Sequence, residues 1–160
     1  MKKLYFAFGS NMLRERIEQR VGKVTYITTY GVNGWRLVFN AGSDKKAFAN
    51  MVKSTDYRDH VMGVLYELTS TQMRILDQHE GCPHLYTRMV VDRYKRAKDV
   101  FAYVSINPDY TQQASRRIQP ARDYVELMIA GYEQNYLPKE AELLRSTVLP
   151  LAAKGHGVMW

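Results

Sequence analysis

The strongest constraint on the fold lies near the start of the chain, where a short apolar run stops abruptly at a glycine. Leu4 to Phe8 has about the length of one strand, and Gly9 permits backbone conformations that other residues avoid. Ser10 and Asn11 are both favourable N-caps for a helix over Met12 to Arg20. The segment therefore predicts a buried strand that turns directly into a helix.

The turn formed by Gly9, Ser10 and Asn11 has two interpretations. Backbone N–H groups at the start of a helix point outward, and such groups bind carboxylate or phosphate. An ordinary strand–turn–helix connection has the same sequence, and the segment taken alone favours this simpler interpretation. The turn becomes a candidate binding site only together with residues elsewhere in the chain.

Turn residues and hydrophobic patterns divide the rest of the chain into further strands and helices. The expected strands are Lys23 to Tyr30, Trp35 to Asn40, Ala47 to Lys53, His60 to Leu68, Tyr86 to Tyr94 and Val100 to Ile106. The expected helices are Thr69 to His79, Pro120 to Asn135 and Pro138 to Ala153. Strands mostly precede helices, which predicts an α+β fold, a small mixed β-barrel of about six strands flanked by helices. No repeat or long linker interrupts the 160 residues, so we expect residues 1–160 to form a single domain.

Composition and charge bear on the compartment and the partners. No stretch approaches the roughly 18 consecutive apolar residues of a membrane span, and Gly9 ends the first apolar run too early for a signal peptide. We therefore expect a cytoplasmic protein with no membrane partner, and its single cysteine, Cys82, excludes an intramolecular disulfide. The net charge of +7 would attract nucleic acid. The one basic cluster, however, falls at an expected hairpin turn and comprises Arg93, Lys95, Arg96 and Lys98. A solvated turn is favoured there, and nucleic acid is disfavoured as a partner.

A second candidate for chemistry is Glu80, at the end of the short helix and just before Gly81. Leu76 lies four residues earlier, so Glu80 shares a helix face with an apolar residue. Poor solvation and the negative end of the helix dipole would both raise the pKa of this carboxyl and make it a better base near neutral pH. The competing interpretation is a solvated glutamate at a helix end, which is common.

A metal site competes for the same segment, which contains His79, Glu80, Cys82 and His84. Zinc sites prefer wider loops between ligand pairs, no second pair occurs elsewhere, and Pro83 restricts how these side chains could converge. Cys82 as a nucleophile would need a nearby base and an orienting residue, and the sequence names no such third residue. We therefore do not expect a metal at this segment.

Five features of the sequence occur together in a fixed order: Tyr5 to Asn11, Gly63 to Leu68, Leu76-Asp77-x-x-Glu80-Gly81, Tyr86, and Pro120 with Tyr124. Together they resemble the pattern of one family, the gamma-glutamylcyclotransferase (AIG2-like) family. The matches follow the family's order and extend from Tyr5 to Gly131, most of the chain. Each match is weak alone, and together they are fairly specific.

The resemblance implies a fold, a reaction and a set of site residues. The fold is a small barrel of mixed strands flanked by helices. The reaction is an acyl transfer in which a small gamma-glutamyl amine or amide cyclises to 5-oxoproline and releases an amine or amino acid, without a cofactor or metal. Glu80 matches the family's general acid/base. The expected substrate-binding residues are Phe8, Gly9, Ser10, Asn11, Tyr86 and Tyr124.

The chain also departs from the family pattern. Phe8 stands where tyrosine is usual, Ala121 where serine is common, and Tyr132 where a small residue is common. These departures support the alternative of a non-catalytic protein on the same fold that binds a small molecule or a partner. The identity of the leaving amine and a homodimer are left open. The loops 41–46 and 107–119 are predicted to lie on the leaving-group side.

Overall fold

The structure is a computed structural model that describes residues 1–42, 46–106 and 119–152. The strands are β1 (Lys2–Ala7), β2 (Thr25–Asn33), β3 (Trp35–Gly42), β4 (Ala47–Lys53), β5 (His60–Thr69), β6 (Thr87–Tyr94) and β7 (Lys98–Val104). The helices are α1 (Arg14–Val21), α2 (Ser70–His79), α4 (Arg122–Gln134) and α5 (Pro138–Thr147), with short 3-10 helices η1 (Ser10–Met12) and η2 (Leu149–Leu151). All seven expected strands form, with ends that shift by a few residues.

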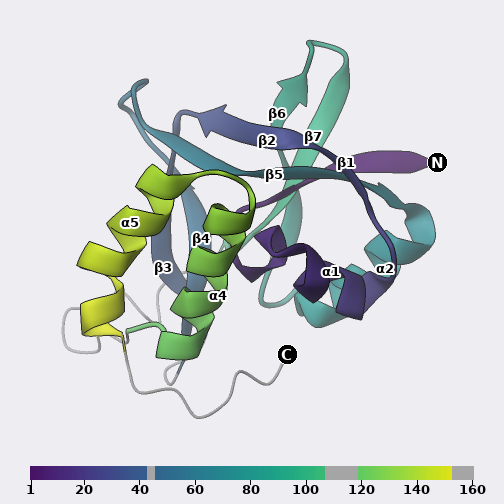
Figure 1. Ribbon diagram of the computed structural model, residues 1–160. Helices are drawn as coiled ribbons and strands as arrows, with labels where there is room; N and C mark the ends of the chain where they lie inside the picture. The colour runs from purple at the N-terminus through teal and green to yellow at the C-terminus, as the bar shows by residue number, and fades with distance from the viewer. Residues whose placement is uncertain (43–45, 107–118, 153–160) are drawn as a thin grey trace.

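The strands form two sheets. A five-stranded sheet has the order β2-β5-β1-β7-β6, and β3 and β4 form a separate hairpin. Strand β1 lies at the centre, antiparallel to β5 and parallel to β7. In Figure 1 the large sheet runs across the top, α1 and α2 lie together beneath it, and α4 and α5 pack near the β3–β4 hairpin. The fold is therefore α+β, as expected.

The expected barrel of about six strands is wrong. Within the described residues β2 and β6 remain the two edges of the large sheet, so its ladder of hydrogen bonds does not close. The chain turns sharply at Gly34, where φ is +79°, and β3 then pairs with β4 and not with β2. The result is an open mixed sheet with a hairpin beside it.

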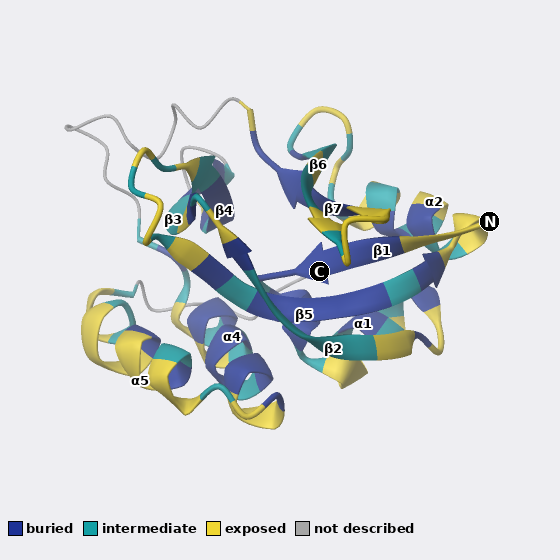
Figure 2. Ribbon diagram, turned by 90° about the horizontal axis from the view of Figure 1, so that it is seen from above, coloured by how far each residue is buried: buried dark blue, intermediate teal, exposed yellow. Residues whose placement is uncertain are grey.

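Burial is deepest where β1 and β5 meet. Phe6, Ala7, Val64 and Leu65 expose none of their surface, and the central strands are dark blue in Figure 2, where the outer faces of the helices are yellow. Strand β1 is therefore buried among other elements on both sides, as its continuous apolar run predicts. The buried end of β1 consequently fixes the position of the turn that begins at Gly9.

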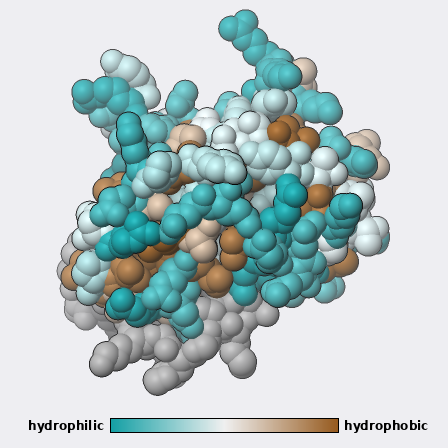
Figure 3. All heavy atoms as spheres, viewed as in Figure 1, coloured by the Kyte–Doolittle hydropathy of each residue, from teal (hydrophilic) through white to brown (hydrophobic). Residues whose placement is uncertain are grey.

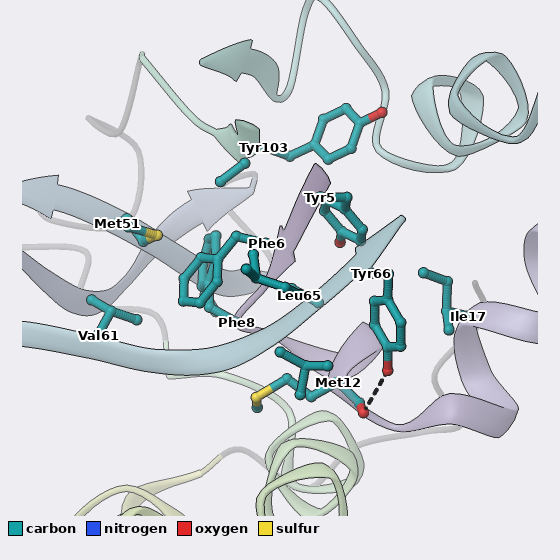
Figure 4. Close-up of a cluster of buried hydrophobic side chains, with 14 of the residues drawn as sticks. Tyr5, Phe6, Phe8, Met12, Ile17, Met51, Val61, Leu65, Tyr66 and Tyr103 are labelled. Atoms are coloured by element: carbon teal, nitrogen blue, oxygen red, sulfur yellow. Dashed lines mark hydrogen bonds between the residues drawn. The ribbon is translucent and has the colours of Figure 1, made fainter. Parts of the chain in front are cut away.

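Strand β5 and helix α4 support the turn after β1. Tyr66 in β5 donates a hydrogen bond to the Met12 carbonyl oxygen at 2.9 Å, drawn as a dashed line in Figure 4, and Asn135 donates to the same oxygen at 3.1 Å. Gly131 in α4 allows close packing, because a side-chain carbon there would lie 2.8 Å from Met12 Cβ and 3.1 Å from the Leu13 nitrogen. Helix α4 therefore supports η1 directly.

Three boundaries of helices differ from the sequence-based expectation. The expected helix over Met12 to Arg20 divides into η1 and α1, because Leu13 between them has an extended backbone (φ −75°, ψ 117°). The helix expected to open at Pro120 begins at Arg122, because Pro120 makes a β-bridge with Ala47. The last helix ends at Thr147 and is followed by η2.

The surface seen in Figure 3 is mostly hydrophilic, with smaller hydrophobic patches. Among the described residues no helix is long and apolar enough to cross a membrane. The basic cluster lies at the β6–β7 hairpin turn, which projects at the top of Figure 1. Lys95 and Arg96 are exposed there and have positive φ, which confirms the expected solvated turn.

Candidate functional site

Helix α2 positions Glu80 through well-defined caps at both ends. At its start Thr69 accepts a hydrogen bond from the Gln72 amide at 3.1 Å, and the Gln72 side chain accepts one from the Thr69 amide at 3.0 Å, which confirms the expected capping box. At its end the Cys82 amide donates to the Asp77 carbonyl at 2.9 Å, and Gly81 takes the left-handed conformation with φ +61°. Glu80 is the C-cap residue, so its direction is fixed by this termination.

The side chain of Asn11 joins Glu80 to the turn after β1. Its Nδ2 donates to Glu80 Oε1 and to the Tyr5 hydroxyl oxygen, both at 3.1 Å. Its Oδ1 accepts from Arg20 Nη1 at 3.2 Å. The same Nη1 lies 3.8 Å from Glu80 Oε1, an ion pair whose two side chains are 6% and 16% exposed. The side-chain amide of Asn11 thus connects β1, the turn that follows it, α1 and the end of α2.

The carboxyl of Glu80 has an unusual protonation behaviour. Burial raises its pKa from the ordinary 4.5 to about 7, although Arg20, the hydrogen bond from Asn11 and Arg16 all favour the charged form. A carboxyl that titrates near 7 can accept and return a proton at neutral pH. Among the described residues only Oε1 accepts a hydrogen bond, and no donor reaches Oε2.

Glu80 and the Gly9–Asn11 turn line the same hollow, of about 40 Å³. The remaining lining residues are Tyr5, Phe8, Arg20, Phe48, Ala49, Tyr86, Tyr103 and Tyr124. All seven residues expected at the site from the sequence are therefore gathered around one cavity. The amides of Ser10 and Asn11 open the short helix η1 and have no acceptor within it.

Two buried tyrosines that line the hollow are hydrogen-bonded to the backbone of β4. Tyr86 donates to the Ala49 carbonyl oxygen at 2.7 Å, and the Ala49 amide donates to the Tyr124 hydroxyl oxygen at 3.1 Å. Gly9 is in close contact with this wall, because a side-chain carbon there would lie 3.1 Å from the Tyr124 hydroxyl. Phe8 carries no hydroxyl and stacks on Phe6 at 6.2 Å between ring centroids.

A third tyrosine is tied to α2. Tyr103 donates to Asp77 Oδ1 at 2.5 Å, and Arg88 donates to both oxygens of the same carboxylate, at 2.8 Å for Oδ1. The Arg88 and Tyr103 hydrogen bonds hold the pKa of Asp77 below its ordinary value even though burial alone would raise it. Asp77 therefore remains a carboxylate that orients Tyr103, whereas burial raises the pKa of Glu80, three residues later, to about 7.

Sequence reasoning missed Tyr5, Arg20 and Tyr103. Tyr5 belongs to an apolar run and Tyr103 to a strand, where both are indistinguishable from core residues. A signal did exist for α1, since Arg16 and Arg20 are four residues apart and therefore share one helix face. Arg16 donates to the Ser10 hydroxyl at 3.4 Å, so this face points at the turn.

The alternative chemistry at the end of α2 has little geometric support. Within the described parts of the chain, no three His, Cys, Asp or Glu side chains are grouped so that they could hold a metal ion. His79 and His84 are exposed, and Cys82 is half-buried. Of the loops expected on the leaving-group side, residues 43–45 and 107–118 lie outside the described residues.

Comparisons of the whole chain with known proteins point to one family. The family described as "Gamma-glutamyl cyclotransferase, AIG2-like" matches residues 5–126. A gamma-glutamylcyclotransferase of Bos taurus is 24% identical over 160 residues, 95% of this chain and 81% of the relative, and that of Homo sapiens is 26% identical over 144 residues, 86% and 73% respectively. A solved structure titled "Gamma-glutamyl cyclotransferase" superposes with a TM-score of 0.75 at 21% identity, over 100% of this chain and 93% of the other.

Proposed function

The chain belongs to the gamma-glutamyl cyclotransferase, AIG2-like family, and from this membership we propose that it cyclises a small gamma-glutamyl amine or amide to 5-oxoproline. The leaving group is an amine or amino acid. The observation that carries the proposal is that Glu80, with its pKa of about 7, lines the same hollow as the Gly9–Asn11 turn. One side supplies a proton carrier and the other supplies amide donors.

Glu80 acts as the general acid/base of the reaction. The carboxylate takes a proton from the α-ammonium of the glutamyl group, and the resulting amine nitrogen bonds to the γ-carbonyl carbon. The carbonyl electron pair moves onto oxygen, and its return breaks the bond to the leaving nitrogen. That nitrogen takes the proton from Glu80 and leaves as an amine. The restored carboxylate then takes the second proton of the attacking nitrogen, which becomes the neutral amide of the ring, and passes it to the released amine, which departs as an ammonium. Oε2 suits this role, since Oε1 is occupied by Asn11.

The turn and the tyrosine walls bind the glutamyl group. The amides of Gly9, Ser10 and Asn11 hold its carboxylate end or polarise its carbonyl, and the nearby Arg20 guanidinium adds positive charge. Phe8, Tyr86 and Tyr124 form the walls that fold the flexible substrate into attack geometry. The residues that line this site extend from Tyr5 to Tyr124 along the chain. Because one site draws on so much of the sequence, we propose that residues 1–160 form a single domain.

The size of the hollow limits what it can enclose. A cavity of about 40 Å³ holds only a few water molecules, so the glutamyl end fills it and the leaving group projects outward. Selectivity for the amine then depends on residues around the mouth.

The test is the release of 5-oxoproline from a panel of gamma-glutamyl amines and gamma-glutamyl amino acids. We expect turnover of at least one compound and its loss in Glu80→Gln. Glu67→Gln is a matched control, because the Glu67 side chain is 22% exposed and pairs with Lys2 and Lys98 away from the hollow. Equal turnover by the Glu80→Gln protein would overturn the role of Glu80. A wild-type protein that binds these compounds without converting any of them would support the non-catalytic alternative.

A further inference from the structure

Tyr5 is a buried hydroxyl group that the sequence did not nominate and the proposed reaction does not yet use. Its residue is 4% exposed, and its ring packs between those of Tyr103 and Tyr66, with centroids 5.7 Å and 6.4 Å away (Figure 4). The ring is therefore fixed by its neighbours. Tyr5 also lines the hollow that contains Glu80.

The hydrogen-bond network settles which way the amide of Asn11 points. Arg20 can only donate, so the atom of Asn11 that faces it must be the carbonyl oxygen Oδ1. The NH₂ group of Asn11 then faces Tyr5 and Glu80 and donates to both. The Tyr5 oxygen consequently acts as an acceptor in this contact, and its own proton points elsewhere.

Within the described residues the Tyr5 hydroxyl accepts from Asn11 and donates no hydrogen bond. Two other tyrosines of the hollow differ, since Tyr86 donates to Ala49 and Tyr103 donates to Asp77. A buried donor without an acceptor is costly unless a ligand supplies one. The Tyr5 hydroxyl is thus a hydrogen-bond donor that lines the same hollow as Glu80.

We propose that the Tyr5 hydroxyl is a further catalytic residue, which donates a hydrogen bond to the γ-carbonyl oxygen as it becomes an oxyanion. The inference rests on the proposed cyclisation. Asn11 couples the two groups, because one NH₂ group holds both Glu80 Oε1 and the Tyr5 oxygen. Burial and the nearby Glu80 keep the pKa of Tyr5 well above its ordinary value, so the hydroxyl remains a donor while Glu80 changes its charge.

The test compares Tyr5→Phe with Tyr30→Phe. The first substitution removes the hydroxyl and keeps the ring. Tyr30 is a matched control because its hydroxyl donates to Asp92 at 2.7 Å and lies outside the hollow. We expect kcat to fall by about 100-fold or more in Tyr5→Phe, as for the loss of one oxyanion donor, with little change in KM. Unchanged kcat in a folded Tyr5→Phe protein would overturn the inference.

A second substitution separates donation to substrate from support of Asn11. A fluorotyrosine at position 5 keeps the hydroxyl, which becomes a stronger donor and a weaker acceptor. We expect kcat at or above that of the wild type, with the pH profile unmoved. A role limited to holding Asn11 predicts a lower kcat and a shifted profile. This variant also decides the question if Tyr5→Phe does not fold.

Failure of the proposed function can be distinguished from failure of this inference. If no gamma-glutamyl compound is converted by the wild type, calorimetry with 5-oxoproline replaces the rate measurement, because its lactam oxygen is the former γ-carbonyl oxygen. Weaker binding by Tyr5→Phe than by the wild type and Tyr30→Phe would support the donor. Equal binding, or none by any of the three proteins, would overturn it.

Discussion

The buried carboxyl of Glu80 should make the protein less stable than its Glu80→Gln variant at neutral and higher pH. In the unfolded chain the carboxyl regains its ordinary pKa of 4.5, whereas in the folded protein the pKa is about 7. Between these values the unfolded state loses its proton first, so the free energy of unfolding decreases as pH rises. Below both values the effect of this group vanishes.

The magnitude follows from the size of the shift. Each pKa unit corresponds to about 1.4 kcal/mol, so the full effect above pH 7 is about 3 kcal/mol, and about 1 kcal/mol of it is already present at pH 5. The glutamine has no charge to bury and still accepts from Asn11. We therefore expect the advantage of Glu80→Gln in free energy of unfolding to grow by about 2 kcal/mol between pH 5 and pH 8.

Thermal and urea unfolding of both proteins at pH 5 and pH 8 provide the measurement. For a chain of this length about 2 kcal/mol corresponds to roughly 4–8 °C in Tm. Other titrating groups are common to both proteins and cancel in the difference. The reasoning is refuted if the difference between the two proteins does not depend on pH, or if Glu80→Gln is the less stable protein at pH 8.

Two further predictions concern the surroundings of the hollow. Gly131→Ala places a carbon 2.8 Å from Met12 Cβ, so we expect a loss of about 1–3 kcal/mol in urea unfolding together with reduced turnover, and full stability would show that α4 does not support the turn. Cys82→Ser should leave the rate of 5-oxoproline release unchanged, since the Cys82 side chain packs against the core and does not line the hollow, and abolished turnover would favour a nucleophilic cysteine.

Local signals in the sequence predicted much of the site. The capping box at Thr69 and the glycine at Gly81 define the ends of α2, and they place Glu80 correctly at its C-terminus. The apolar run before Gly9 marks β1 for the same reason, because a strand buried on both sides has no polar alternation. These features depend on residues close together in the chain.

Features that depend on long-range pairing were predicted less well. Closure of a barrel requires backbone hydrogen bonds between the edge strands. Side chains of β2 and β6 meet where Tyr30 donates to Asp92, but no local pattern shows that the two strands lack a backbone ladder within the described residues. Pro120 is a good first residue of a helix, yet its bridge to Ala47, far away in the sequence, delays the helix to Arg122. The proposed role of Tyr5 could not be predicted for the same reason. It depends on the orientation of the Asn11 side chain, which is set by contacts with Arg20 and Glu80.

The central claim is that Glu80 exchanges a proton with the substrate in a poorly solvated hollow. The most direct measurement is kcat/KM for a converted gamma-glutamyl amine as a function of pH. The account predicts a rate that rises with pH through an inflection near 7, because the free enzyme must hold the carboxylate form of Glu80. An inflection near 4.5, the ordinary pKa of a glutamate, would contradict it.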